Sequence, residues 1–204
     1  MRNQCKPSQN KDEHLHLITL PFTTERLHLR RFTPADLDAY ADYHRIPEVY
    51  RYLYAPTPDE AQLASLFSQA ITSRFTEDGD ILYCAVTLKD SGELIGEVLL
   101  KLANGAALQG EIGYIFNPAY AGKGYAAEAV KSVLDRGFAE SGFHRIFARL
   151  DAANQGSIGV VERLGMRKEA HLRQNDRFNG EWGDELIYAL LQEEWRQTRE
   201  QERL

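Results

Sequence analysis

The segment with the most chemical potential is a glycine-containing turn between an expected strand and an expected helix. It reads Gly122-Lys123-Gly124 and precedes an amphipathic helical pattern from Tyr125 to Glu140. The free N–H groups of a helix's first turn and the positive end of its dipole attract anions, and glycines let a phosphate come close to the main chain. The turn therefore predicts a site for a phosphate-bearing ligand. The alternative is that the two glycines only supply a tight connection.

Two nucleotide-binding motifs do not match this turn. Gly124, rather than Ser or Thr, follows Lys123, so the phosphate-binding loop of ATPases is absent from the sequence. No Gly-x-Gly-x-x-Gly opens a strand–helix–strand unit either. ATP and dinucleotides are therefore disfavoured as ligands.

The cysteines and histidines indicate no second chemistry. Cys5 lies in a polar leader and Cys84 in an apolar run, a pattern typical of one tail thiol and one core thiol. His14, His16 and His28 have no accompanying ligand cluster with metal-binding spacing. We expect no bound metal, no cysteine nucleophile and a reducing compartment, the cytoplasm.

The elements that must position this turn form one α+β domain with a mixed, mostly antiparallel sheet of about seven strands. The patterns indicate a strand, two helices, three strands, a helix, a strand, a helix and a final hairpin at Asn179-Gly180. The second helix is expected to begin with a capping box from Thr57 to Glu60. We predict a polar leader over 1–20, the domain over 21–192 and a charged tail over 193–204, helical and solvated.

Composition narrows the class of protein further. The chain has 204 residues, of which 43% are hydrophobic and 26% charged, with a formal net charge of −6. These values are typical of one globular domain that buries its own core. The acidic balance disfavours a nucleic-acid surface, and no run approaches the roughly 18 apolar residues of a membrane span. We therefore expect neither a nucleic-acid nor a membrane partner.

Three separated strings, in this order and on these elements, resemble the GNAT superfamily of N-acetyltransferases over about residues 22–192. They are Glu111-Ile112-Gly113-Tyr114, Asn117-Pro118 to Ala129, and Asn154-Gln155-Gly156-Ser157 to Leu164-Gly165-Met166. The Gly-Lys-Gly-Tyr-Ala-x-Glu-Ala and Asn-Gln-x-Ser strings look most like the Rim-type branch. That branch acetylates the N-termini of ribosomal proteins and includes members with other acceptors.

The resemblance implies acetyl-coenzyme A as the cosubstrate and a splayed pair of parallel strands that binds it. Its pantetheine arm would extend like an added strand along the backbone of Ile115 and Phe116, whose donors can polarise the thioester carbonyl. Asn154 matches a position that hydrogen-bonds this arm. The pyrophosphate would lie on the main-chain amides of Gly122, Lys123, Gly124, Tyr125 and Ala126.

The resemblance also suggests catalytic residues, with two departures from the family pattern. Glu111 matches a catalytic glutamate of some members and is the predicted base, although it could instead be an exposed strand-end residue paired with Lys101. Ala121 replaces the usual Gln or Arg of the phosphate loop, and Val161 replaces a Tyr that protonates the departing thiolate. Ser157 is the predicted substitute acid, although it could simply be a residue of the helix's first turn.

The function implied is transfer of acetyl to a primary amine by direct attack in a ternary complex. The acceptor is a small molecule or a protein N-terminus, and the protein a monomer or homodimer. An aromatic-rich segment is expected to supply part of the acceptor wall, while about half of its residues pack into the core and no single Tyr stands out. Its members are Tyr40, Tyr43, His44, Tyr50, Tyr52 and Tyr54. The alternative is a non-catalytic acyl-coenzyme A-binding regulatory module, which the missing Tyr at Val161 makes plausible.

Overall fold

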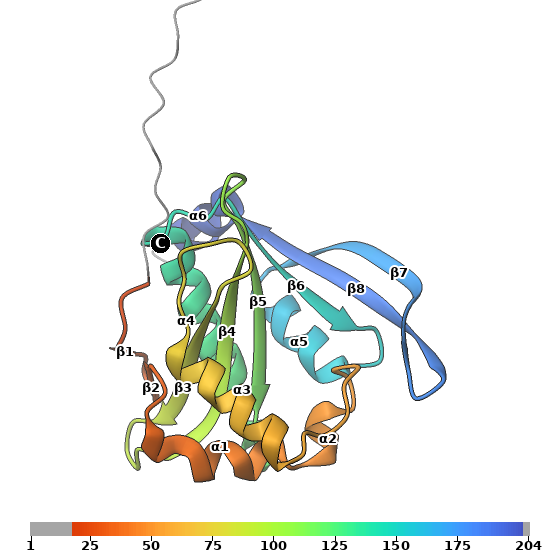
Figure 1. Ribbon diagram of the computed structural model, residues 1–204. Coiled ribbons are helices and arrows are strands. Elements are labelled where there is room, and N and C mark those ends of the chain that lie inside the picture. Colours follow the sequence, from red (N-terminus) through yellow and green to blue (C-terminus); the bar gives the residue numbers. More distant parts are fainter. Residues whose placement is uncertain (1–17, 202–204) are drawn as a thin grey trace, which may run out of the picture.

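A computed structural model describes residues 18–201, which form an eight-stranded sheet in the order β1-β2-β3-β4-β5-β6-β8-β7 (Figure 1). All neighbouring strands are antiparallel except β5 and β6. The strands are β1 (Phe22–Thr23), β2 (Leu27–Arg30), β3 (Ile81–Leu88), β4 (Leu94–Asn104), β5 (Gln109–Phe116), β6 (Arg145–Asp151), β7 (Arg167–Phe178) and β8 (Glu181–Leu191). The helices are η1 (Pro34–Asp36), α1 (Leu37–His44), α2 (Pro47–Tyr50), α3 (Glu60–Thr72), η2 (Pro118–Tyr120), α4 (Tyr125–Ala139), α5 (Gln155–Arg163) and α6 (Gln192–Gln201).

The α+β class and the mostly antiparallel sheet are confirmed, and the structure adds short elements that were not expected, among them η2. The two residues of β1 add an eighth strand, and α2 is a four-residue helix between the two predicted ones. Ile18 is fully buried in the core, so ordered packing begins before Pro21. Most of the predicted leader, with Cys5, His14 and His16, lies outside the described residues.

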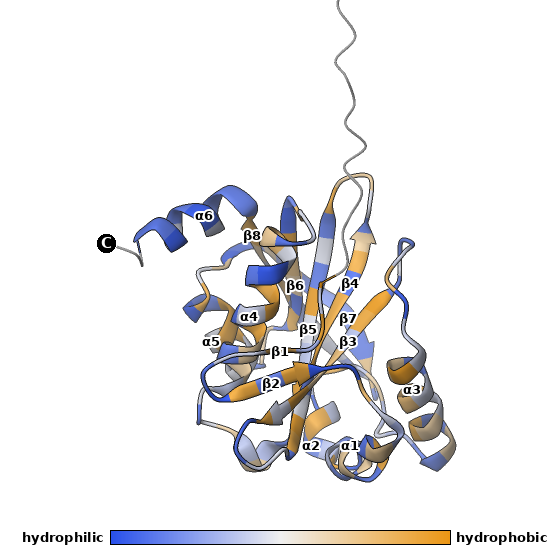
Figure 2. Cartoon of the chain, turned by 90° about the vertical axis from the view of Figure 1, so that its left-hand side faces the viewer, coloured by the Kyte–Doolittle hydropathy of each residue, from blue (hydrophilic) through white to orange (hydrophobic). Residues whose placement is uncertain are grey.

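Helices cover both faces of the sheet, so the central strands are buried on two sides. Figure 2 shows α1 and α3 on one side of the strands and α4 and α5 on the other, with hydrophobic segments between them. One core cluster joins α1 and α3 to the sheet through Tyr40, Tyr43 and Phe67. The larger cluster joins α4 and α5 to the opposite face. A strand such as β4 is therefore mostly apolar and is buried from Leu94 to Val98.

The parallel pair β5–β6 separates soon after it begins. Its pairing covers only Gln109 with Arg145, Gly110 with Ile146 and Glu111 with Phe147. Beyond these residues β5 continues to Phe116 and β6 to Asp151 without pairing to each other. The expected splayed pair is therefore present, and the edge of β5 that faces β6 offers backbone groups to a ligand.

Two local predictions about helices are corrected by the structure. The cap of α3 is Asp59, whose side chain accepts from the Gln62 amide at 2.8 Å, so the box from Thr57 to Glu60 was wrong by two residues. The C-terminal segment is helical but not simply solvated. In α6, Trp195 stacks on Phe138 of α4, and its indole N–H donates to Asp135 at 2.7 Å.

No helix within residues 18–201 is long and apolar enough to cross a membrane. In the same part of the chain, no group of three or more His, Cys, Asp or Glu side chains is arranged to hold a metal ion.

Candidate active site

The turn before α4 has the backbone geometry that an anion site requires. Gly122 and Gly124 adopt φ values of +76° and +80°, which favour glycine, and Gly124 is the N-cap of the 15-residue helix α4. The first-turn amides of α4 therefore point toward the turn. The glycines therefore supply the tight connection and leave the amides of the first turn open, a geometry compatible with the predicted anion site.

A cavity of about 680 Å³ lies between this turn, the end of β5 and α5. It brings together six of the eight residues predicted to bind the cosubstrate. Its cations are Lys123 and Arg163, the latter in the last turn of α5. The residues that line it are Tyr114, Phe116, Asn117, Pro118, Tyr120, Ala121, Gly122, Lys123, Gly124, Tyr125, Ala126, Ala127, Gly156, Val160 and Arg163.

Arg26, just before β2, holds this turn in place. Its guanidinium donates to the Lys123 carbonyl at 2.9 Å and to Glu128 at 2.7 Å, and lies 4.6 Å from the centre of the Tyr125 ring. Glu128 also accepts from the Thr24 hydroxyl at 2.5 Å and from the Arg26 amide at 2.9 Å. Burial acts to raise the pKa of Glu128, but these hydrogen bonds outweigh it and lower that pKa. Glu128 thus stays ionised while it ties α4 to β2.

The two predicted residues at the start of α5 form its cap. Asn154 accepts through Oδ1 from the Ser157 amide at 3.0 Å. The Tyr114 hydroxyl donates to the Ser157 carbonyl, also at 3.0 Å, which fixes this turn against β5. Neither Asn154 nor Ser157 lines the 680 Å³ cavity, although Gly156 between them does. Val161 is fully buried, one turn beyond Ser157.

Glu111 is the third residue of β5 rather than its first, and it lies where β5 and β6 begin to diverge. Its carboxylate is 3.7 Å from the Lys101 ammonium on β4, and its side chain is about a quarter exposed. Its charge also acts on Arg149 of β6, whose pKa is raised mainly by a hydrogen bond to Glu185. The pairing with Lys101 is the alternative that the sequence left open for Glu111.

A second cavity, of about 420 Å³, lies on the opposite face of the sheet beneath α1, α2 and α3. Ile115 lines this cavity, whereas its neighbours Tyr114 and Phe116 line the first one. Successive side chains of a strand point to opposite faces, so one short stretch of β5 separates the two cavities. The second cavity is lined by Tyr40, His44, Tyr50, Ala55, Pro56, Pro58, Gln62, Ser65, Leu66, Tyr83, Glu97, Leu99 and Ile115.

Glu97 on β4 is a buried carboxylate in this second cavity, directly opposite Ile115 in the sheet. Its Oε1 lies 3.2 Å from Nε2 of His44, and Nδ1 of His44 lies 2.6 Å from the Tyr50 hydroxyl. The Glu97 and His44 side chains are 1% and 2% exposed. Burial raises the pKa of Glu97, and the interaction with His44 opposes this rise only in part. We call the set Tyr50, His44 and Glu97 the buried triad.

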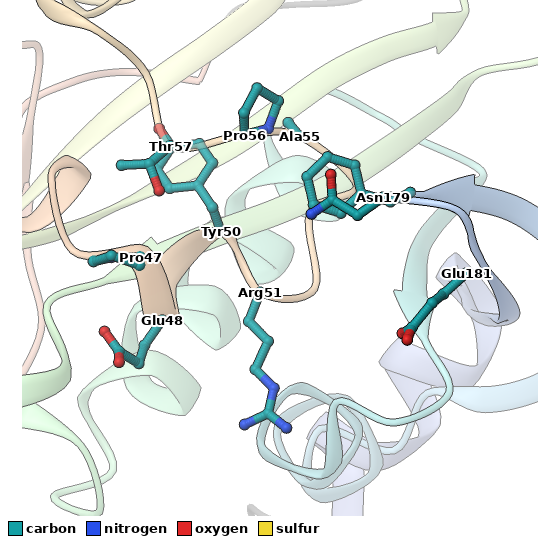
Figure 3. A pocket seen from close by; sticks show the side chains of 10 residues that line it. Pro47, Glu48, Tyr50, Arg51, Ala55, Pro56, Thr57, Asn179 and Glu181 are labelled. Carbon is teal, nitrogen blue, oxygen red and sulfur yellow. The ribbon is translucent and has the colours of Figure 1, made fainter.

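The second cavity continues outward into a cleft of about 610 Å³ between α2 and the turn of the β7–β8 hairpin. Tyr50, Ala55 and Pro56 line both spaces. Figure 3 shows the outer cleft, with Tyr50 and the segment after α2 facing Asn179 of the hairpin turn. A ligand that enters from this side therefore passes Tyr50 before it reaches Glu97.

The loop that carries Ala55 and Pro56 is fastened to the far strands by Tyr54. The Tyr54 hydroxyl donates to Asp151 at the end of β6, and its ring lies against Gly183 of β8. Tyr54 itself has φ of +50°, a strained conformation for a bulky residue. These contacts hold one wall of the second cavity in a fixed position.

Sequence reasoning missed Glu97, Arg26 and Arg163. The signal for Glu97 was present, because it is a single charge inside the apolar run from Leu94 to Leu100. Arg26 and Arg163 had no comparable signal, since an arginine beside a strand or in a helix's last turn is ordinarily a solvated residue.

Comparison with known proteins agrees with this geometry. The sequence matches the acetyltransferase (GNAT) domain over residues 26–167. It is 34% identical over 173 residues to the uncharacterized N-acetyltransferase YnaD of Bacillus subtilis, covering 85% of this chain and 98% of that protein. It is 26% identical over 177 residues to the ribosomal protein uS5-alanine N-acetyltransferase of Escherichia coli, covering 85% and 91% of the two chains. A solved GNAT-family acetyltransferase from Bacillus anthracis is 30% identical, with a TM-score of 0.77 over 85% of this chain and 99% of that one.

The fold and the matched domain define the class: the chain belongs to the GNAT family and is an acetyltransferase. Within the family, its similarity to a ribosomal-protein alanine N-acetyltransferase is consistent with the Rim-type branch.

Proposed function

We propose that this acetyltransferase moves the acetyl group of acetyl-coenzyme A to a primary amine, either a small molecule or a protein N-terminus, by direct attack in a ternary complex. The observation that carries the proposal is the placement of two cavities on opposite sides of the end of β5. Ile115 faces one and Phe116 the other, so two ligands can meet across a single strand. No covalent intermediate on the protein is needed in such an arrangement.

The first cavity fits coenzyme A. Its turn offers first-turn amides of α4 and the charges of Lys123 and Arg163 to a pyrophosphate, and its other wall is the unpaired edge of β5. Ala121 stands where the family pattern has Gln or Arg and offers no side-chain donor. The backbone amides are therefore the main donors of the loop. The backbone of Ile115 and Phe116 would hold the pantetheine arm, with Asn154 at its side.

Acetyl-coenzyme A supplies an acetyl group activated as a thioester. The residues of this chain orient it, exclude water from the buried end of the second cavity and remove the proton that an ammonium carries at neutral pH. Backbone donors of β5 at the splay polarise the carbonyl. Ser157 as the acid that protonates the thiolate and the cytoplasmic location stay predictions. Glu111, which the family pattern suggests as the base, is paired with Lys101 and is one of two candidate carboxylates for that role.

A panel of amines tests the proposal. Each amine, among them phenethylamine, spermidine and a short peptide with a free N-terminus, is incubated with acetyl-coenzyme A while free thiol is measured. At least one amine should release thiol well above the rate without amine. Binding of coenzyme A without thiol release from any amine would instead favour the regulatory module.

A further inference from the structure

The second cavity contains one acidic oxygen that the protein leaves open. Glu97 is 1% exposed, and its Oε2 has no hydrogen-bond partner within residues 18–201. An unpaired buried carboxylate oxygen is costly, so buried polar atoms are almost always satisfied by the protein, by ordered water or by a ligand. The open oxygen therefore indicates a donor that comes from outside the chain.

The groups around Glu97 are tyrosine hydroxyls and one imidazole, and none of them hydrogen-bonds Oε2. The titratable groups that face it are Tyr40, Tyr43 and His44 of α1, Tyr50 of α2 and Tyr83 of β3. No Lys or Arg lines the cavity. Among its lining residues Glu97 is the one carboxylate, and the remaining walls are mostly aromatic and aliphatic. The cavity thus combines one anionic point with apolar sides, which suits a primary ammonium attached to an apolar segment.

We propose that Glu97 binds the ammonium of the acceptor through Oε2 and takes its proton, which makes Glu97, rather than Glu111, the catalytic base. The inference rests on the proposed function. Glu97 lies opposite Ile115, at the point of β5 where the two cavities adjoin, whereas Glu111 does not line the second cavity. Glu111 is then the ion-pair partner of Lys101.

The ammonium gives one proton to the Glu97 carboxylate and becomes a free amine. Its nitrogen then forms a C–N bond with the acetyl carbon while the C–S bond of the thioester breaks. The second proton lost by the nitrogen ends on the departing thiolate, which leaves as the thiol. One proton remains on Glu97 and must reach solvent before the next turnover.

The other two members of the buried triad provide the route for that proton. His44 contacts Glu97 through Nε2 at 3.2 Å and Tyr50 through Nδ1 at 2.6 Å. Tyr40 stacks on the imidazole at 3.9 Å between ring centres, which fixes its orientation. Tyr50 lines the outer cleft as well as the second cavity. An imidazole accepts a proton on one nitrogen while releasing one from the other, so His44 can relay the proton outward.

The kinetic test compares Glu97→Gln with Glu111→Gln, using phenethylamine as acceptor. Glu97→Gln should lower kcat/KM by about 100-fold near neutral pH, with partial recovery at high pH where solution supplies free amine. The native rate should rise with pH as the Glu97 carboxyl loses its proton, and Glu97→Gln should lack this limb. Glu111→Gln should keep the native pH profile. Coenzyme A affinity, measured by calorimetry, should be unchanged in both variants.

An NMR titration of the native protein tests the same assignment without turnover and without a substituted variant. With the glutamate side-chain carboxyls labelled with ¹³C, one resonance should titrate above the usual glutamate range, and addition of phenethylamine should lower that midpoint. Thiol release by the native protein tests the proposed function, and its absence would overturn that function. The ¹³C titration tests the role of Glu97 independently of turnover. A parallel pH profile for Glu97→Gln, or a buried carboxyl that ignores the amine, would overturn the assignment of Glu97.

Discussion

The contact between Tyr54 and Gly183 allows a sharp test of how one wall of the proposed acceptor cavity is held in place. A Cβ placed on Gly183 would lie 2.7 and 2.8 Å from Cε1 and Cζ of the Tyr54 ring, closer than such atoms are found. Gly183→Ala must therefore displace Tyr54 and separate its hydroxyl from Asp151. The loop with Ala55 and Pro56 would then lose its fastening to β6 and β8.

The size of the effect follows from two opposing contributions. A hydrogen bond to a charged acceptor contributes about 1.5–3 kcal/mol, near the lower end here because Tyr54 is only half-buried. Replacing a strand glycine with alanine stabilises by about 0.4–1 kcal/mol when nothing collides. We expect Gly183→Ala to lower the free energy of unfolding by about 1 kcal/mol, or roughly 2–4 °C in Tm for a chain of this size.

The assay is a double-mutant cycle with Gly183→Ala, Tyr54→Ala and their combination, with Tyr54→Phe as the matched control for the hydroxyl alone. In the Tyr54→Ala background, Gly183→Ala should no longer destabilise, so the two changes should couple by about 1–2 kcal/mol. The KM for the amine should rise in Gly183→Ala, while coenzyme A affinity stays the same. Equal destabilisation by Gly183→Ala in both backgrounds would refute the reasoning.

Three further predictions concern residues singled out by the sequence. Glu111→Gln should change the free energy of unfolding by about 0–1 kcal/mol, as expected for a part-exposed ion pair, and should change kcat/KM less than a few-fold. A loss of about 100-fold in kcat/KM that high pH rescues would instead identify Glu111 as the base. Cys84 is fully buried, and burial raises the pKa of its thiol to about 12. Cys84→Ala should therefore keep turnover and lower the free energy of unfolding by about 1 kcal/mol. Detection of acetylated Cys84 by mass spectrometry would contradict direct attack. Ala126 lines the first cavity in a helical conformation, so Ala126→Leu should weaken coenzyme A binding at least tenfold in calorimetry without a fall in Tm. This variant avoids Gly124, whose φ of +80° would strain any other residue whatever its effect on the ligand.

The sequence predicted the larger elements because their signals are local. Period-two strands, caps and the Asn179-Gly180 turn each depend on a few neighbouring residues, as does the glycine turn before α4. The elements that it missed, β1, α2 and η2, have two, four and three residues, too few to show a period. For short elements the deciding contacts come from the rest of the fold.

The acceptor side was harder to predict because its residues meet only in three dimensions. Glu97 and His44 are 53 positions apart in the chain. Glu97 lies in a strand covered on both faces, so the apolar run around it gives no alternation that would show which way it points. The sequence predicted that the aromatic segment forms part of the acceptor wall, but it could not tell which tyrosines do so. In the structure Tyr40 and Tyr50 line the cavity, whereas Tyr43 is buried in the core.

The alternation of side chains along β5 limits how this protein can change during evolution. A one-residue insertion within β5 would turn Ile115 toward the first cavity and Phe116 toward the second, so it would exchange the proposed donor and acceptor surfaces at once. Gly96 adds to this constraint, because a Cβ there would lie 2.5 Å from the Ile115 carbonyl oxygen and 2.7 Å from the Phe116 ring. The outer cleft, in contrast, is lined by α2, the loop after it and the β7–β8 turn, none of which lines the first cavity. New acceptor preferences can therefore arise in these segments by substitution or by changes in loop length, while the strand between the two ligands stays the same.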